Sequence, residues 1–160
     1  MKAQKVVELF KERSLTLGAV ESMTAGLFSA AITEVPGASQ IFAGSLITYN
    51  IAQKENLVGI SPENIQKYGV ISWEVASQMA YNGRVRLNVD YCISVTGNAG
   101  PTADKGDKEI GCVYIGIASK DYLWGVPLNL SGTRDEIRQK AVEAMLQALE
   151  SLLRPAAKVN

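Results

Sequence analysis

Hydrophobic residues recur along this chain with the period of a helix in some segments and as the short apolar runs of strands in others. Helices are predicted at residues 1–10, 24–33, around 54, 61–69, from 72 onward, and from 133 to a stop at 155. Strands are predicted at residues 15–20, 41–49, 90–96, 111–118 and 122–130. This order predicts an α/β fold, a three-layer α/β/α sandwich with a mixed sheet. We expect a single domain over residues 1–160.

Local patterns also predict burial and helix ends. Segment 24–33 is apolar nearly all round, which predicts a buried helix. Hydroxyl residues stand at three helix starts, namely Ser61, Ser72 and Thr133. Thr133 forms a capping box with Glu136. In the helix after Ser72, Val75 and Met79 are expected to face inward, with Val85 as a further candidate.

Composition narrows the function. The chain has no histidine, which excludes a Ser-His-Asp triad, an HExxH zinc site and any imidazole relay. Its 16 basic and 16 acidic residues give no net attraction to nucleic acid or anionic membrane. No apolar run is long enough to cross a bilayer, and the N-terminus lacks the core of a signal peptide, so we expect a cytoplasmic protein. Cys92 and Cys112 lie in apolar strands, which predicts buried, reduced thiols without a metal-binding pattern.

Ser22 is the first candidate for chemistry. It follows a strand and precedes a helix, so it could simply cap that helix. Ligands of open α/β sheets bind at this edge, however, and a serine near a helix start lies in a field that stabilises a developing alkoxide. Thr24 keeps the turn polar, and Glu21 could orient a base, accept a hydrogen bond from an amide or pair with a cation.

Lys54 is the candidate base for such a serine. A lysine early in a short helix is most often a solvated surface group. To act as a base it must be desolvated or lie near another cation, so that it loses its proton near neutral pH. Tyr49 and Thr48, at the end of the preceding strand, could supply a wall and a hydroxyl partner.

A glycine loop follows the strand at residues 90–96. Thr96, Gly97 and Gly100 could be an ordinary tight turn, or a nest of backbone amides for an oxyanion or phosphate. The loop lacks the Gly-Lys-Ser/Thr ending of a P-loop. The cations Lys105, Lys108 and Arg134 are candidates for phosphate or carboxylate contact, with a solvated surface role as the alternative for each.

These segments, in this order, resemble the CinA C-terminal domain family, whose members include nicotinamide-nucleotide amidases. The family's ESCTGG corresponds to residues 21–26, its VPGAS to 35–39 and its TYSNEAK to 48–54. Its HGAVS corresponds to 68–72, its TGIAGP to 96–101 and its EKPVGTV to 107–113. An arginine near the last helix corresponds to Arg134.

The resemblance implies a homo-oligomer that hydrolyses the carboxamide of nicotinamide mononucleotide without a metal or other cofactor. It implies Ser22 as the nucleophile, Lys54 as the general base and Tyr49 as a further catalytic group. Substrate contacts are expected from nearby polar groups, from the glycine loop and from two cations. These residues are Glu21, Thr24, Thr48, Thr96, Gly97, Gly100, Lys108 and Arg134.

Three positions depart from the family pattern. Met23 replaces a cysteine, Ala25 replaces a glycine and Asn98 replaces a small apolar residue. The segment 102–109 also differs from the family's glycine-rich stretch. Side chains at 25 or 98 can narrow the pocket. The alternative to an amidase is therefore a catalytically impaired paralogue that binds a nucleotide without turnover.

Overall fold

The computed structural model describes residues 2–103 and 106–154. The helices are α1 (Lys2–Glu12), α2 (Leu27–Thr33), a 3₁₀ turn (Ala38–Gln40), α3 (Ile51–Val58), α4 (Pro62–Tyr68), α5 (Trp73–Leu87) and α6 (Arg134–Leu153). The strands are β1 (Leu17–Glu21), β2 (Phe42–Ile47), β3 (Tyr91–Gly97), β4 (Cys112–Ala118) and β5 (Leu123–Asn129). The predicted order of elements is therefore confirmed, with ends shifted by a few residues.

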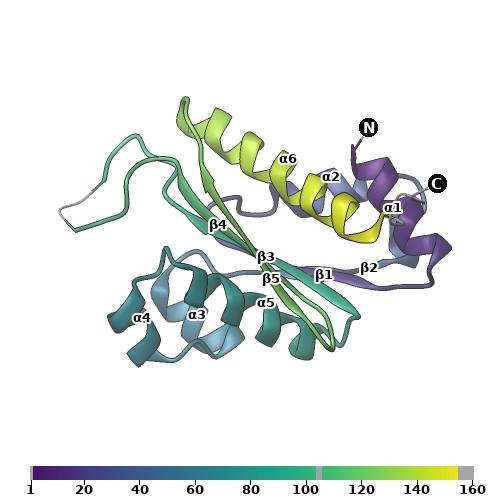
Figure 1. Ribbon diagram of the computed structural model, residues 1–160, viewed down its shortest axis with the longest axis horizontal. Helices are drawn as coiled ribbons and strands as arrows, with labels where there is room; N and C mark the ends of the chain where they lie inside the picture. The colour runs from purple at the N-terminus through teal and green to yellow at the C-terminus, as the bar shows by residue number, and fades with distance from the viewer. Residues whose placement is uncertain (1, 104–105, 155–160) are drawn as a thin grey trace, which may run out of the picture.

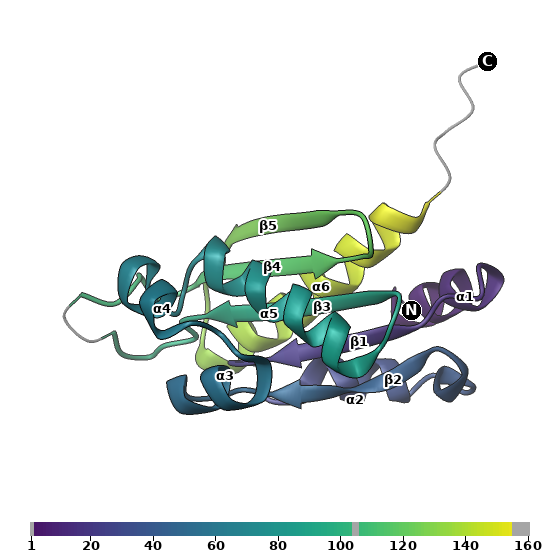
Figure 2. The ribbon, with the colours of Figure 1, turned by 90° about the horizontal axis from the view of Figure 1, so that it is seen from below.

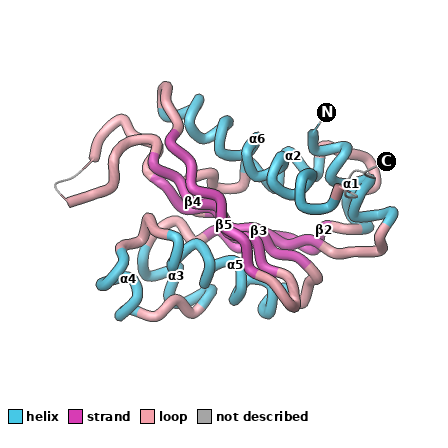
Figure 3. The backbone as a smooth tube through the Cα atoms, in the orientation of Figure 1, coloured by secondary structure: helices cyan, strands magenta, loops and turns pink. Residues whose placement is uncertain are grey.

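The five strands form one sheet in the order β2-β1-β3-β4-β5. β1 pairs in parallel with both β2 and β3, whereas β4 lies antiparallel between β3 and β5. Helices α1, α2 and α6 cover one face, and α3, α4 and α5 cover the other (Figures 1 and 3). The prediction of a three-layer α/β/α sandwich with a mixed sheet is correct.

Each face of the sheet has its own apolar core. The larger core includes residues of α1, α2 and α6, and the smaller one includes residues of α3 and α5. Gly83 allows α5 to lie close to the sheet. A Cβ at this position would come within 2.3 Å of Val20 and 2.9 Å of Cys92. α5 is thereby held tightly against β1 and β3.

The predicted helix caps are present. The Ser61 and Ser72 hydroxyls accept hydrogen bonds from the amides of Asn64 and Val75. Thr133 forms the predicted reciprocal capping box at the start of α6. Each cap satisfies backbone donors that the first helical turn leaves without a partner.

The prediction for segment 24–33 is partly wrong. α2 begins three residues later than predicted, after Gly26, which adopts a left-handed conformation and has no side chain to cap the helix. Only Phe28 and Ile32 are buried in it. Phe28 and Ile32 lie on the packed side of the helix, whereas Ala30 and Thr33 on its other side are exposed.

Two other burial predictions need correction. Val85 is 57% exposed, because it lies on the outer side of α5. Both cysteines are free thiols, but only Cys92 is buried, while Cys112 is partly exposed at the start of β4. Burial raises the pKa of the Cys92 thiol to about 12, as expected for an inert core thiol.

The carboxyl ends of β1, β2 and β3 lie at the same edge of the sheet, where α3 lies and α6 begins (Figure 2). The predicted site residues follow these strand ends. Within the described residues, no helix combines the length and the apolar character needed to cross a bilayer.

Candidate active site

Ser22 and Lys54 meet at this edge. Ser22 directly follows β1, and Lys54 lies in α3, which begins after the Asn50 cap. Because β1 and β2 run parallel, the chain leaving β2 returns beside the end of β1. The Lys54 Nζ lies 2.9 Å from the Ser22 Oγ and 2.7 Å from the Thr48 carbonyl oxygen. The predicted juxtaposition of alcohol and amine is present.

The amine of this pair is buried. Lys54 is 3% exposed and Ser22 is 7% exposed. Among the described residues, Lys54 forms no ion pair. Desolvation lowers the pKa of Lys54 from 10.5 to about 8. A substantial part of the population is then neutral just above physiological pH, which a general base requires.

The bond to the Thr48 carbonyl orients this amine. A neutral amine has two N–H donors and one lone pair. When one N–H donates to the Thr48 carbonyl, the lone pair is free to accept the Ser22 hydroxyl proton. The Thr48 amide in turn donates to the Glu21 carbonyl oxygen at 2.9 Å, which fixes the Thr48 backbone to the end of β1.

Glu21 caps α2 in place of Ser22. Its carboxylate is fully buried and accepts from the amides of Gly26, Phe28 and Ser29. The hydroxyls of Thr24 and Ser29 donate to it as well. Of the roles considered from sequence, acceptance from amides is the one observed. The Ser22 hydroxyl is therefore not needed as the helix cap and is left to Lys54.

The glycine loop packs tightly beside β4. The Thr96 hydroxyl donates to the Val70 carbonyl at 2.8 Å, and a Cβ at Gly97 would come within 2.9 Å of the Cys112 carbonyl oxygen. The Gly100 amide donates to the Asn98 side chain at 2.9 Å. An oxyanion at the Gly100 amide would compete with that side chain, which the family pattern lacks.

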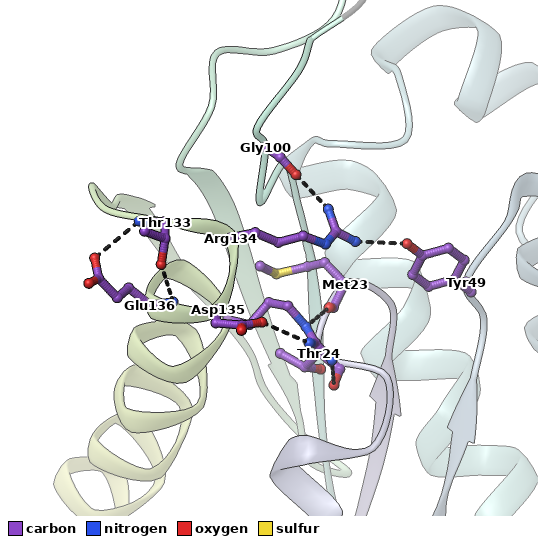
Figure 4. A network of polar contacts seen from close by, with 9 residues as sticks. Met23, Thr24, Tyr49, Gly100, Thr133, Arg134, Asp135 and Glu136 are labelled. Carbon is purple, nitrogen blue, oxygen red and sulfur yellow. Dashed lines mark hydrogen bonds and ion pairs between the residues drawn. The ribbon is translucent and has the colours of Figure 1, made fainter.

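Arg134 links two other predicted residues, Gly100 and Tyr49, into one network. Its guanidinium donates to the Gly100 carbonyl at 2.6 Å and to the Tyr49 hydroxyl at 2.9 Å (Figure 4). Tyr49 is 59% exposed. Lys108 is exposed, and its carbonyl accepts a hydrogen bond from the Asn98 side chain at 2.9 Å. Lys105 lies outside the described residues.

Arg138 is a site residue that the sequence did not reveal. It donates to the carbonyls of Met23 at 2.9 Å and Thr24 at 3.2 Å, and it pairs with Asp135 at 3.6 Å. α6 therefore fastens the turn that follows Ser22. The available signal was its spacing of four residues from Arg134, which places both cations on one side of the helix.

Ala25 is held in an unfavourable backbone conformation. Its φ of 46° lies in the left-handed region, at the position where the resembled family has glycine. Replacing Ala25 by glycine is expected to raise the free energy of unfolding by about 0.5–1 kcal/mol, measured by urea denaturation. In the control, the same change at exposed Ala30 inside α2 should lower it by about 1 kcal/mol. If both Ala25→Gly and Ala30→Gly lowered the free energy of unfolding, Ala25 would not be in a strained conformation.

Fold and site together define an α/β domain with a buried Ser–Lys pair at the carboxyl ends of parallel strands. The model of the CinA C-terminal domain matches residues 1–153, and the chain belongs to this family. A competence-damage inducible protein of Thermoanaerobacter sp. (strain X514) is 40% identical over 149 residues, covering 93% of this chain and 35% of that protein. A CinA-like protein of Prochlorococcus marinus (strain MIT 9515) is 39% identical over 151 residues, which cover 92% of this chain and 35% of that protein. The chain thus spans about a third of the length of these relatives.

Solved structures show the same fold. The competence/damage inducible protein CihA from Agrobacterium tumefaciens has a TM-score of 0.91 and 27% identity, covering 96% of this chain and 94% of that one. The CinA superfamily protein from Enterobacter cloacae has a TM-score of 0.92 and 24% identity, and the match covers 96% of this chain and 90% of that one. The mixed five-stranded sheet is therefore the family's architecture.

Proposed function

We propose that this protein hydrolyses the carboxamide of nicotinamide mononucleotide, or of a closely related pyridine nucleotide, to the acid and ammonia. The observation that carries this proposal is the 2.9 Å contact between the Ser22 hydroxyl and the buried Lys54 amine. An amide is a poor electrophile and needs an activated nucleophile. In a chain without histidine, an adjacent neutral lysine supplies that activation.

The proposed reaction has two halves. The Ser22 Oγ attacks the carboxamide carbon while its proton passes to Lys54. The C–N bond then breaks, and Lys54 returns the proton to the nitrogen, which leaves as ammonia. In the second half Lys54 takes a proton from water, the hydroxide attacks the acyl-enzyme, and Ser22 departs with that proton. Lys54 ends each half unprotonated, so the cycle needs no metal or other cofactor.

The remaining predicted residues would bind the nucleotide. Arg134 carries a charge suited to a phosphate, and the exposed Tyr49 ring beside it offers an apolar surface. The Thr96 loop lies across the same edge. The choice of a pyridine nucleotide depends on the resemblance to the family's amidases, since the names of these relatives specify no substrate.

The test is ammonia release from nicotinamide mononucleotide by the purified protein, with Ser22→Ala as the control. The Ser22 backbone amide bonds to the Val95 carbonyl, and this bond is unaffected by the substitution. We expect release from the wild type only. No release above that of Ser22→Ala would exclude the amidase. A rise in melting temperature with the mononucleotide, without turnover, would instead favour the non-catalytic alternative.

A further inference from the structure

The turn of residues 22–26 joins β1 to α2 and begins with the candidate nucleophile. Ala25 and Gly26 in this turn have positive φ values of 46° and 99°. The Ala25 amide donates to the Ser22 carbonyl at 3.1 Å, which closes the turn. A residue other than glycine stays left-handed only where the surrounding structure holds it there. The conformation of this turn therefore depends on contacts from outside it.

Arg138 of α6 supplies such contacts. Its Nε donates to the Met23 carbonyl at 2.9 Å and its Nη2 donates to the Thr24 carbonyl at 3.2 Å. These two nitrogens share one edge of the planar guanidinium, so both carbonyls must face the arginine together. The Arg138 side chain is only 24% exposed, whereas that of its third partner, Asp135, is 88% exposed. An ion pair so open to water contributes little, so the two carbonyls are the main partners of Arg138.

The two carbonyls belong to the residues that directly follow Ser22. On its other side Ser22 is held by its amide, which donates to the Val95 carbonyl at 3.2 Å. The Lys54 amine is held separately, by the Thr48 carbonyl at 2.7 Å. The 2.9 Å contact between the Ser22 hydroxyl and Lys54 thus joins two segments that are positioned independently. A shift of about 1 Å at a reacting group can cost about 100-fold in rate.

We propose that Arg138 is a positioning residue, whose guanidinium fixes the turn after Ser22 so that the serine hydroxyl stays within reach of Lys54. This inference rests on the proposed function and adds to it a residue that the substrate need not touch. Arg134, one turn earlier on α6, contacts the glycine loop instead. The two arginines are therefore expected to differ in their kinetic effects, Arg138 acting on the chemical step and Arg134 on substrate binding.

The experiment measures kcat and KM for ammonia release from nicotinamide mononucleotide, well below the melting temperature of each variant. Arg138→Met keeps an aliphatic stem but has no donor for the two carbonyls. We expect kcat to fall about 10–100-fold while KM stays within about threefold. Arg134→Met should instead raise KM about 10-fold, with a smaller change in kcat. Arg86→Met, at an exposed position in α5, is the control that should leave both unchanged.

A second measurement does not depend on the nucleotide. Phenylmethanesulfonyl fluoride modifies activated serines: the Ser22 oxygen bonds to sulfur, fluoride leaves, and the serine proton passes to Lys54. Intact mass follows this reaction, with Ser22→Ala as the blank. We expect modification of Arg138→Met to be about 10-fold slower than that of the wild type. Arg138→Lys keeps the charge without the planar pair of donors and should be slowed as well. If Arg138→Met does not fold, Arg138→Gln takes its place.

Each outcome has a distinct meaning. Equal kcat and equal modification rates in the wild type and Arg138→Met overturn the positioning role and leave the proposed function intact. A lower melting temperature with an unchanged kcat shows that the contacts of Arg138 are only structural, and a wild-type rate in Arg138→Lys shows that only its charge matters; both overturn the inference. A wild type that releases no ammonia, yet is modified faster than Arg138→Met, overturns the amidase alone. A wild type inert in both assays overturns both proposals.

Discussion

Replacing Lys54 by methionine is expected to lower kcat for ammonia release about 10³–10⁴-fold. Methionine fills nearly the same volume but cannot accept the Ser22 proton across the present 2.9 Å contact. Because the free enzyme must lose a proton from Lys54, kcat/KM of the wild type should rise with pH and level off above a midpoint of about 8. Initial rates from pH 6 to 10 measure both effects.

Two further variants test whether Lys54 acts through its ability to accept a proton or only through its positive charge. Lys54→Arg keeps a cation but cannot be deprotonated, so its activity should fall as far as that of Lys54→Met. Lys67→Met, at an exposed position in α4, should leave the rate unchanged. Substantial activity in Lys54→Arg would contradict a role for Lys54 as the base.

The same lysine is expected to make stability depend on pH. Its pKa is about 8 in the folded protein and 10.5 as the ordinary value, so between these values the unfolded chain binds more protons. Stability should therefore rise with pH across this window and be lowest below it. The shift corresponds to a penalty of about 3 kcal/mol at pH 7. Urea denaturation at several pH values, with Lys54→Met as reference, isolates this contribution.

The fold was readable from sequence because its signals are local. Hydroxyl caps at Ser61, Ser72 and Thr133 and the apolar strands fix where elements begin. The start of α2 was misplaced because its cap is not the adjacent serine. It is the carboxylate of Glu21, which contacts amides as far as eight residues along the chain. The burial of α2 and of Val85 depends on which elements pack against them, and the spacing of hydrophobic residues along the chain does not give that information.

The site was only partly readable. Serine at a strand end and the TYSNEAK-like segment identified Ser22 and Lys54, but their distance and the burial of the amine depend on the parallel pairing of β1 with β2. Arg138 contacts Met23 and Thr24, which precede it by 115 and 114 positions in the sequence, so these contacts are likewise set by tertiary structure. The burial of the Thr48 hydroxyl, which has no hydrogen-bond partner among the described residues, likewise has no sequence signature, since it depends on tertiary packing.

Glu21→Gln is expected to lower the free energy of unfolding by about 3 kcal/mol. The Glu21 carboxylate accepts from Thr24 at 2.7 Å and from the amides of Gly26 and Phe28 at 3.1 and 3.0 Å through one oxygen. Ser29 donates to the other oxygen from its amide at 3.2 Å and its hydroxyl at 2.6 Å. Glutamine must turn an NH₂ toward one of these groups of donors.

Denaturation midpoints in urea measure the loss, with exposed Glu143→Gln on α6 as the matched change. The control should stay within about 0.5 kcal/mol of the wild type. Since Glu21 immediately precedes Ser22, the loosened turn should also reduce ammonia release in the fraction that remains folded. Equal midpoints for the two variants would mean that the buried carboxylate does not hold the turn behind the nucleophile.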